Sequence, residues 1–179
     1  GNKISIRHLL SHTSGIPQHY VALPDFPISI DKVFHSSEDL INLFSKLPLK
    51  FEPGEKYSYS SPGFYILGAI LQEVSKKSYA ELLDEYIFTP LHLKNTKVEN
   101  NKSIYLDMAT GYEKGLSGLV RTGIEDKSTA LAAGDILSTS LDLYKWSNTF
   151  SYNVDKILSA NSKKILFDYV SENDPNTFA

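Results

Sequence analysis

The hydroxyl groups of Tyr59 and Ser61 lie just ahead of an apolar run, within F-E-P-G-E-K-Y-S-Y-S-S-P-G-F-Y-I-L-G at residues 51–68. A phenol at the entrance of a helix can take part in proton transfer, so Tyr59 is the first candidate for catalysis. A free phenol has a pKa of about 10, and a tyrosine base near pH 7 needs a neighbouring ammonium group to lower that pKa by about three units. Tyr59 and Ser61 are therefore the candidate catalytic residues.

Both candidates also have a structural interpretation. Tyr59 alone is typical of a half-buried turn aromatic, because tyrosine is commonly structural. Ser61 followed by Pro62 is typical of a helix N-cap with proline at the first helical position. The Ser61 hydroxyl can cap a helix and still offer one hydrogen bond, so the pattern leaves both interpretations open.

Histidine and cysteine patterns give no support for a metal ion or a cofactor. His12 could serve as a general base, but a lone histidine at a turn is more often a hydrogen-bonded packing residue. The other histidines show no metal-binding spacing such as His-Glu-x-x-His: His8, His19, His35 and His92. The absence of cysteine excludes disulfides, thiolate metal sites and cysteine nucleophiles. We therefore expect no metal and no cofactor.

Charge and hydropathy argue against two kinds of partner. A net charge of −3 and a pI near 6.0 give no basic footprint for nucleic acid or anionic lipid. The longest apolar run, residues 64–71, is far shorter than the roughly 18 residues that a membrane span requires. With 179 residues, 41% of them hydrophobic, the chain is long enough for one core. We expect a single helical domain over residues 1–179.

Most signals for secondary structure are helical. A short helix capped by Ser5 should present Ile6, Leu9 and Leu10 on one face. Caps, proline stops and apolar spacing predict further helices: from Ser36 or Ser37 to about Lys46 with Leu40, Leu43 and Phe44 inward, from Gly63 to about Lys76, from Ser78 to about Phe88, from Ser140 to about Phe150, and from Asn161 to about Tyr169. Trp146, with Leu143 and Phe150 at helical spacing, is expected to be a core residue rather than a ligand platform.

Strand signals are scarce. Gly111-Tyr112 and the glycine-rich residues 115–123 could form a hairpin or an irregular loop, and the pattern does not separate the two. Residues 94–135 carry the weakest signals of the chain. The sum predicts a mainly α fold with at most short β segments.

Four blocks of the chain are similar to segments of one family. Residues 4–17, I-S-I-R-H-L-L-S-H-T-S-G-I-P, resemble its I-T-I-R-H-L-L-T-H-T-S-G-L; residues 51–78 resemble its F-x-P-G…Y-S-N-x-G-Y-x-L-L-G…V-S-G-x-S. I-F-T-P-L at 87–91 is like I-F-x-P-L-G-M, and residues 132–142 are like A-G-G-L-x-S-T-A-x-D. The family is that of serine β-lactamases and penicillin-binding proteins, particularly its class C β-lactamase, D-alanyl-D-alanine carboxypeptidase and esterase branch. The resemblance implies the helical subdomain of the serine β-lactamase/transpeptidase-like fold.

The chain departs from the family at its chemical motifs. Tyr59-Ser60-Ser61 stands where the family has Tyr-x-Asn, and a hydroxyl cannot present the paired donor and acceptor of an amide. The family's Ser-x-x-Lys precedes the first block and its Lys/His-Thr-Gly follows the last. Ser29-Ile-Asp-Lys32 and Arg121-Thr122-Gly123 imitate these motifs in the wrong order, so we interpret both as turn or cap residues.

The resemblance implies an acyl-serine hydrolase acting on a β-lactam, a D-Ala peptide or an ester, in the bacterial cell envelope or secreted. This chain would be a truncated part of a larger two-subdomain hydrolase, inactive by itself. Its partners would be a small-molecule or peptide substrate, and an exposed apolar face would favour homo-oligomers. The alternative is a non-catalytic helical binding module of the same fold.

Overall fold

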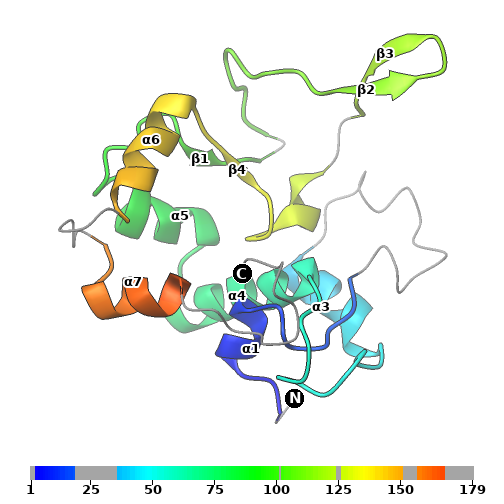
Figure 1. The fold of residues 1–179 in the computed structure, drawn as a ribbon. Helices are drawn as coiled ribbons and strands as arrows, with labels where there is room; N and C mark the ends of the chain where they lie inside the picture. The colour runs from blue at the N-terminus through cyan, green and yellow to red at the C-terminus, as the bar shows by residue number, and fades with distance from the viewer. Residues whose placement is uncertain (1–2, 19–35, 101, 124–125, 151–156, 168–179) are drawn as a thin grey trace.

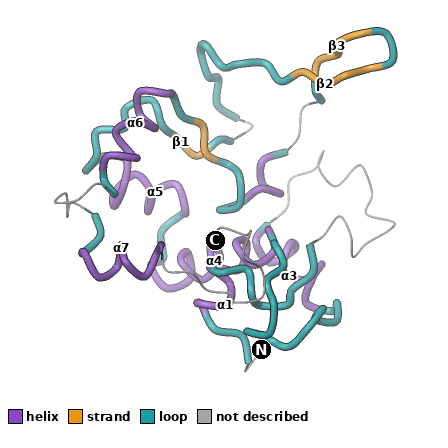
Figure 2. The backbone as a smooth tube through the Cα atoms, viewed as in Figure 1, coloured by secondary structure: helices purple, strands orange, loops and turns teal. Residues whose placement is uncertain are grey.

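The computed structural model describes residues 3–18, 36–100, 102–123, 126–150 and 157–167, and within them the fold is mainly helical. Figure 1 shows α1, α3 and α4 gathered at one side of the molecule and α5, α6 and α7 at another, with the β2–β3 hairpin projecting from both groups. Figure 2 shows how little of the backbone is strand. The predicted fold class, mainly α with short β segments, is confirmed.

Helices make up most of the elements, and the strands are short. The elements are α1 Ile6–Leu10, α3 Ser37–Ser45, α4 Ser61–Ser75, α5 Tyr79–Leu83, the π-helical turn η2 Asp84–Phe88, β1 Lys97–Val98, β2 Tyr112–Gly115, β3 Gly118–Arg121, the 3₁₀ turn η3 Lys127–Ala130, β4 Ile136–Leu137, α6 Ser140–Asn148 and α7 Ala160–Phe167.

The first core cluster joins α3 to α4. Leu40 and Phe44 of α3 are buried against Tyr65 of α4, and the rings of Phe44 and Tyr65 have centroids 5.9 Å apart. Leu43 packs on this cluster while remaining partly buried. A capping box between Ser36 and Asp39 starts α3, as its sequence predicts. The predicted inward face of this helix is confirmed.

Helix α4 tolerates a glycine in its interior because another segment lies against it. A Cβ atom on Gly68 would stand 2.9 Å from the Cβ of Ala132, closer than two carbon atoms can approach without a shift. Gly68 therefore lets the segment ahead of β4 pack directly on α4. Glycine lowers the helix propensity at this position, but it allows two of the sequence blocks to lie in close contact.

The second core cluster lies under α5 and α6. Phe88, Leu91 and Leu93 are buried, and Trp146 packs against them. The Trp146 ring also meets Phe150 edge-on at 4.9 Å, so its predicted core position is confirmed. Leu143, at helical spacing from Trp146, is 55% exposed. Trp146 points toward the cluster, and Leu143, three residues earlier, lies toward the edge of that face.

A buried carboxylate fastens α6 to the segment after the second cluster. Asp142 accepts hydrogen bonds from the Asn95 N–H at 2.7 Å and the Thr96 hydroxyl at 3.2 Å, and it forms an ion pair with Lys145 at 2.6 Å. The Lys145 ammonium holds the pKa of Asp142 below its ordinary value. The aspartate that ends the 132–142 block thus has a structural role.

Three expectations about element ends and faces need correction. In α1 only Leu9 is buried, while Ile6 and Leu10 are more than half exposed, because a five-residue helix turns just one side to α4. Helix α6 ends at Asn148 rather than near Phe150. The predicted helix from Ser78 to Phe88 begins with its capping box but changes to a π-helical turn from Asp84 onward.

Both sheets are small. Strands β2 and β3 pair antiparallel from Tyr112 opposite Arg121 to Gly115 opposite Gly118, which resolves the open alternative in favour of a hairpin. Strands β1 and β4 pair antiparallel, with Val98 opposite Ile136. Among the described residues, no helix has the length and apolar character to cross a membrane.

Candidate active site at the start of helix α4

Helix α4 is capped by Ser60, one position earlier than the sequence predicts. Ser60 has an extended backbone, with φ −149° and ψ 104°, and its hydroxyl accepts the Gly63 N–H at 3.3 Å. Ser61 and Pro62 are the first two residues of the helix. The expectation that Ser61 is the N-cap was wrong, because Ser60 is the last residue before the backbone becomes helical. The Ser61 hydroxyl is consequently available for other contacts.

Backbone bonds join the first sequence block to the F-E-P-G turn. They run from the Lys50 N–H to the Gly15 carbonyl at 2.8 Å, from the Gly54 N–H to the Thr13 carbonyl at 2.8 Å and from the Ser58 N–H to the His12 carbonyl at 2.9 Å. Gly15 has φ +76°, and a Cβ there would lie 2.3 Å from the Phe51 carbonyl oxygen. Only glycine fits that close approach. The two blocks therefore form one structural unit around Tyr59.

His12 holds the turn that carries Tyr59. Its Nδ1 accepts the Ser60 N–H at 3.2 Å, and its ring centroid lies 4.6 Å from that of Tyr59 and 5.1 Å from that of Phe64. Burial lowers the pKa of His12, which favours the neutral imidazole. A nitrogen that accepts a hydrogen bond carries no proton of its own, so these contacts agree with a packing role for His12.

The two candidate hydroxyls are hydrogen-bonded to each other, and a glutamine side chain binds Ser61. The Ser61 hydroxyl donates to the Tyr59 phenol oxygen at 3.4 Å. The side-chain amide of Gln18 makes two bonds to Ser61: its Nε2 donates to the hydroxyl at 3.2 Å, and its Oε1 accepts the backbone N–H at 2.7 Å. The Tyr59 side chain is 51% exposed, so the phenol can meet a ligand from solvent. Sequence reasoning missed Gln18, whose only signal is its position directly after Gly15-Ile16-Pro17.

The ammonium group that a tyrosine base would need is not bonded to Tyr59. The Lys50 ammonium donates to the hydroxyl of Ser58, the residue before Tyr59, at 3.2 Å. In the described parts of the chain, no lysine or arginine forms a hydrogen bond with the Tyr59 phenol. The described site therefore holds a phenol, a hydroxyl and an amide without a paired cation.

Two segments resemble catalytic motifs, and neither is placed in this site. One lies outside the described residues, and the other lies in the β2–β3 hairpin. Ser29 and Lys32 lie among the residues that the structure does not describe. Arg121 is the last residue of β3 in the projecting hairpin, and the Thr122 N–H donates to the Gly111 carbonyl at 3.0 Å. The turn interpretation is therefore wrong for Arg121, which belongs to a strand, while Thr122 extends the pairing of the hairpin. The described residues contain no cluster of three or more potential metal ligands.

A family model described as Beta-lactamase matches residues 1–178 of the chain. The chain belongs to this beta-lactamase family. The curated relatives of this beta-lactamase-family chain include Protein flp of Staphylococcus aureus, 28% identical over 98% of the chain and 35% of the relative. The human serine beta-lactamase-like protein LACTB, described as mitochondrial, is 33% identical over 74% of the chain and 24% of its own length. The chain thus spans about a third or less of these relatives.

Solved structures of related hydrolases share the fold. A D-stereospecific amidohydrolase from Streptomyces superposes with a TM-score of 0.81 over 97% of this chain and 54% of its own, at 24% identity. The D-amino acid amidase of Ochrobactrum anthropi gives a TM-score of 0.75 over 90% of this chain and 46% of its own, at 26% identity. The resemblance to β-lactamases and penicillin-binding proteins is confirmed at the level of family and fold.

Proposed function

We propose that this chain is the helical part of an acyl-serine hydrolase, within which Tyr59 relays protons. The observation that carries the proposal is the hydrogen bond between the Ser61 hydroxyl and the Tyr59 phenol at the start of α4. In the beta-lactamase family the Tyr-x-Asn motif falls at this place. Residues 1–179 would be one helical domain of a larger hydrolase with two subdomains, and the chain alone would be inactive.

The proposed reaction is acyl transfer through a covalent serine intermediate. Attack by serine needs a group that takes its hydroxyl proton and donors that hold the oxyanion. The half-exposed Tyr59 phenol would pass the proton between the attacking serine and the leaving group, with an ammonium from the family's Ser-x-x-Lys segment beside it. Water would then release the acyl group. No cofactor enters this sequence of steps.

We further propose that Gln18 supplies the amide that Ser61 lacks. An asparagine in the family motif offers a paired donor and acceptor, and a serine hydroxyl cannot reproduce both. Both polar atoms of the Gln18 side-chain amide form hydrogen bonds with Ser61. Together the two side chains bring an amide and a hydroxyl next to Tyr59, where the acyl donor of a substrate would bind.

The substrate would be a small acyl donor: a β-lactam, a D-Ala peptide or an ester. Two of the structures with this fold are described as a D-amino acid amidase and a D-stereospecific amidohydrolase, which supports an amide bond next to a D-configured centre. The choice among the three classes depends on the shape of the pocket rather than on the fold.

Intact-protein mass spectrometry tests the proposal directly. The longer protein that contains this chain should gain one acyl group after incubation with a fluorescent penicillin or a D-Ala ester, whereas the 179-residue chain should gain none. A stoichiometric adduct on the isolated chain would contradict its proposed inactivity. An adduct on Ser29 would show that Ser29, within the Ser29–Lys32 motif, is the nucleophile.

A second candidate function follows from Ser61 itself. The replacement of the motif's asparagine by serine favours a non-catalytic binding module that retains the fold. In that case the longer protein would bind a D-Ala peptide without forming a covalent adduct. The mass measurement separates the two, because only the hydrolase leaves a bound acyl group.

A further inference from the structure

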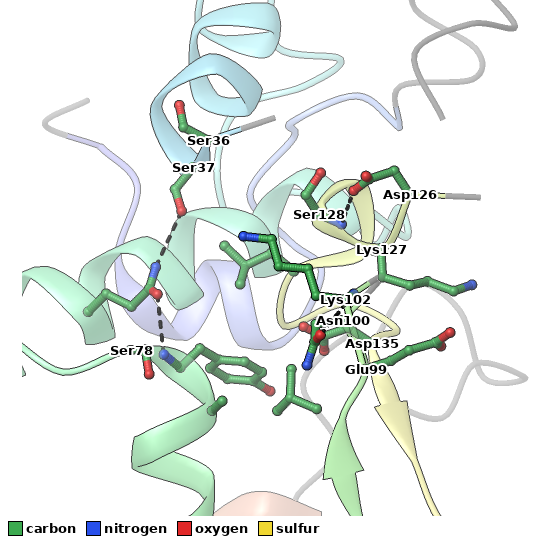
Figure 3. A pocket seen from close by; sticks show the side chains of 15 residues that line it. Ser36, Ser37, Ser78, Glu99, Asn100, Lys102, Asp126, Lys127, Ser128 and Asp135 are labelled. Atoms are coloured by element: carbon green, nitrogen blue, oxygen red, sulfur yellow. Dashed lines mark hydrogen bonds between the residues drawn. The ribbon is translucent and has the colours of Figure 1, made fainter. Parts of the chain in front are cut away.

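A cavity of about 700 Å³ lies at the far end of α4 from Tyr59, and its size is that of a small-molecule site. Residues of α3, α4, α5, the segment after β1 and the segment ahead of β4 line it. We call it the Asp135 cavity and define it by Gln72, Tyr79, Val98, Glu99, Leu131 and Asp135. Figure 3 shows its lining side chains at close range.

One wall of the Asp135 cavity is fixed by hydrogen bonds. The Gln72 side chain donates to the Ser37 hydroxyl at 3.3 Å and accepts the Tyr79 N–H at 3.2 Å, as the dashed lines in Figure 3 show. These bonds tie α3, α4 and α5 together where the cavity begins. The wall is therefore a built surface rather than the gap between loose side chains.

On the opposite wall, one carboxylate oxygen of Asp135 lacks a hydrogen-bond donor among the described residues. Asp135 is 2% exposed, its Oδ2 accepts the Ala132 N–H at 3.3 Å, and its Oδ1 has no hydrogen-bond partner within the described residues. A buried carboxylate oxygen without a donor is costly, so its presence at a cavity wall calls for a ligand that donates. Burial raises the pKa of Asp135, because it penalises the charged form of the carboxylate.

The acidic groups around Asp135 favour a positively charged ligand. The Glu99 N–H donates to the Asp135 main-chain carbonyl at 2.6 Å, and the negative charge of Glu99 makes a minor contribution that raises the pKa of Asp135. Burial, with the charge of Asp135 as a second cause, raises the pKa of Tyr79 to about 12, which keeps its phenol neutral. Lys102 and Lys127 also line the cavity.

We propose that the Asp135 cavity binds a small organic ammonium ion, a protonated amine with a short aliphatic body that donates to Asp135 Oδ1. A charge-assisted hydrogen bond to a buried carboxylate is among the strongest available to a small ligand. The Tyr79 ring, Val98 and Leu131 supply apolar contact for the aliphatic part. The site uses none of the residues in the proposed proton relay, so it stands independently of the acyl-transfer proposal.

Calorimetric titration of the full chain with n-butylammonium tests the proposal, with 1-butanol and butyrate as probes of the same shape. Butylammonium should bind saturably, and the neutral and anionic probes should bind at least about tenfold more weakly. Equal binding of butylammonium and butanol would overturn the proposal, and so would the absence of saturable butylammonium binding, because the cavity would then hold only water or the Lys102 side chain.

Two variants locate the site. Asp135→Asn should weaken butylammonium binding at least about tenfold, whereas Glu113→Gln, which removes an exposed carboxylate in the hairpin, should leave it unchanged. Ala80→Trp places a large ring at the cavity from an exposed helix position, so it should block binding even if Asp135→Asn fails to fold. Binding that survives Ala80→Trp, or that is lost equally in Glu113→Gln, would contradict the assignment.

Discussion

Gln18 and Ser61 show how a site residue can escape detection from sequence. They are 43 positions apart, and only the folded chain brings the Gln18 amide within 2.7 Å of the Ser61 backbone N–H. Tyr59 and Ser61 could be singled out because they flank one turn beside an apolar run. Gln18 could not, since a polar residue after proline is typical of any loop.

The cap of α4 illustrates a second limit at this scale. Ser58, Ser60 and Ser61 stand together at the start of the helix, and a serine-rich turn predicts that a cap exists without choosing among them. The choice follows from backbone angles: Ser60 is extended and its hydroxyl reaches Gly63. The sequence thus predicted the start of α4 to within about one residue and misassigned the hydroxyl that makes it.

The Gln18 amide should matter for acylation if it replaces an asparagine. In the proposed two-subdomain hydrolase, Gln18→Ala should lower kcat/KM for acylation about tenfold or more, and adding Ser61→Asn should restore part of that loss. Gln72→Ala is the matched control, because Gln72 also bridges two elements through its amide but lies at the other end of α4. Acylation at the wild-type rate in Gln18→Ala would show that this amide only supports the turn.

His12 should make stability depend on pH. Burial lowers its pKa in the folded state below the ordinary 6.5, so its contribution is fully present above about pH 6.5 and is lost as the pH falls toward the folded pKa. Urea unfolding between pH 7.5 and 5 should show this loss. His12→Asn keeps an acceptor for the Ser60 N–H and tolerates the φ of 55°, so it should flatten the dependence over this range. Identical pH profiles for both proteins would refute the assignment.

At the scale of elements, capping and apolar spacing predicted most helices and left their ends open. The capping boxes at Ser36 and Ser78 are both present, since each depends on residues only three positions apart. The π-helical turn after Leu83 was not predictable from spacing, because the same residues fit a regular helix. The hairpin was left as one of two alternatives, and the pairing of Tyr112 with Arg121 decides it.

The two glycines of α4 should differ in how well they tolerate alanine. Gly68→Ala should destabilise the chain by about 1–3 kcal/mol, because the new methyl group would meet Ala132 at 2.9 Å. Gly63→Ala meets nothing nearer than 3.7 Å and should stay within about 1 kcal/mol of the wild type. Chemical unfolding of both variants measures the difference. Equal stabilities would mean that α4 and the segment ahead of β4 do not pack this closely.

At the scale of the whole molecule, large apolar side chains remain exposed on several elements. They include Ile6 and Leu10 of α1, Leu71 and Val74 of α4, Leu141 and Tyr144 of α6, and Ile165 and Phe167 of α7. Exposed apolar surface of this extent favours association with another protein surface.

The isolated chain should therefore associate. Light scattering across a wide concentration range should show a dimer or a larger species, and Val74→Glu should shift the equilibrium toward the monomer, because Val74 is 81% exposed on α4. Glu73→Gln, at the neighbouring exposed position, should have no such effect. A monomer at every concentration would contradict this prediction.

Tyr59 is the centre of the proposed proton relay, and its substitution in the proposed two-subdomain hydrolase is the most direct test. Tyr59→Phe removes one oxygen atom from a half-exposed side chain, so circular dichroism should show an unchanged fold. The acylation rate should fall about 10²–10⁴-fold, as is typical when a general acid–base group is lost. Tyr57→Phe, two residues earlier and also beside His12, should retain a rate near that of the wild type. If Tyr59→Phe acylates and deacylates at wild-type rates, Tyr59 is a structural turn residue and the proposed proton relay is wrong.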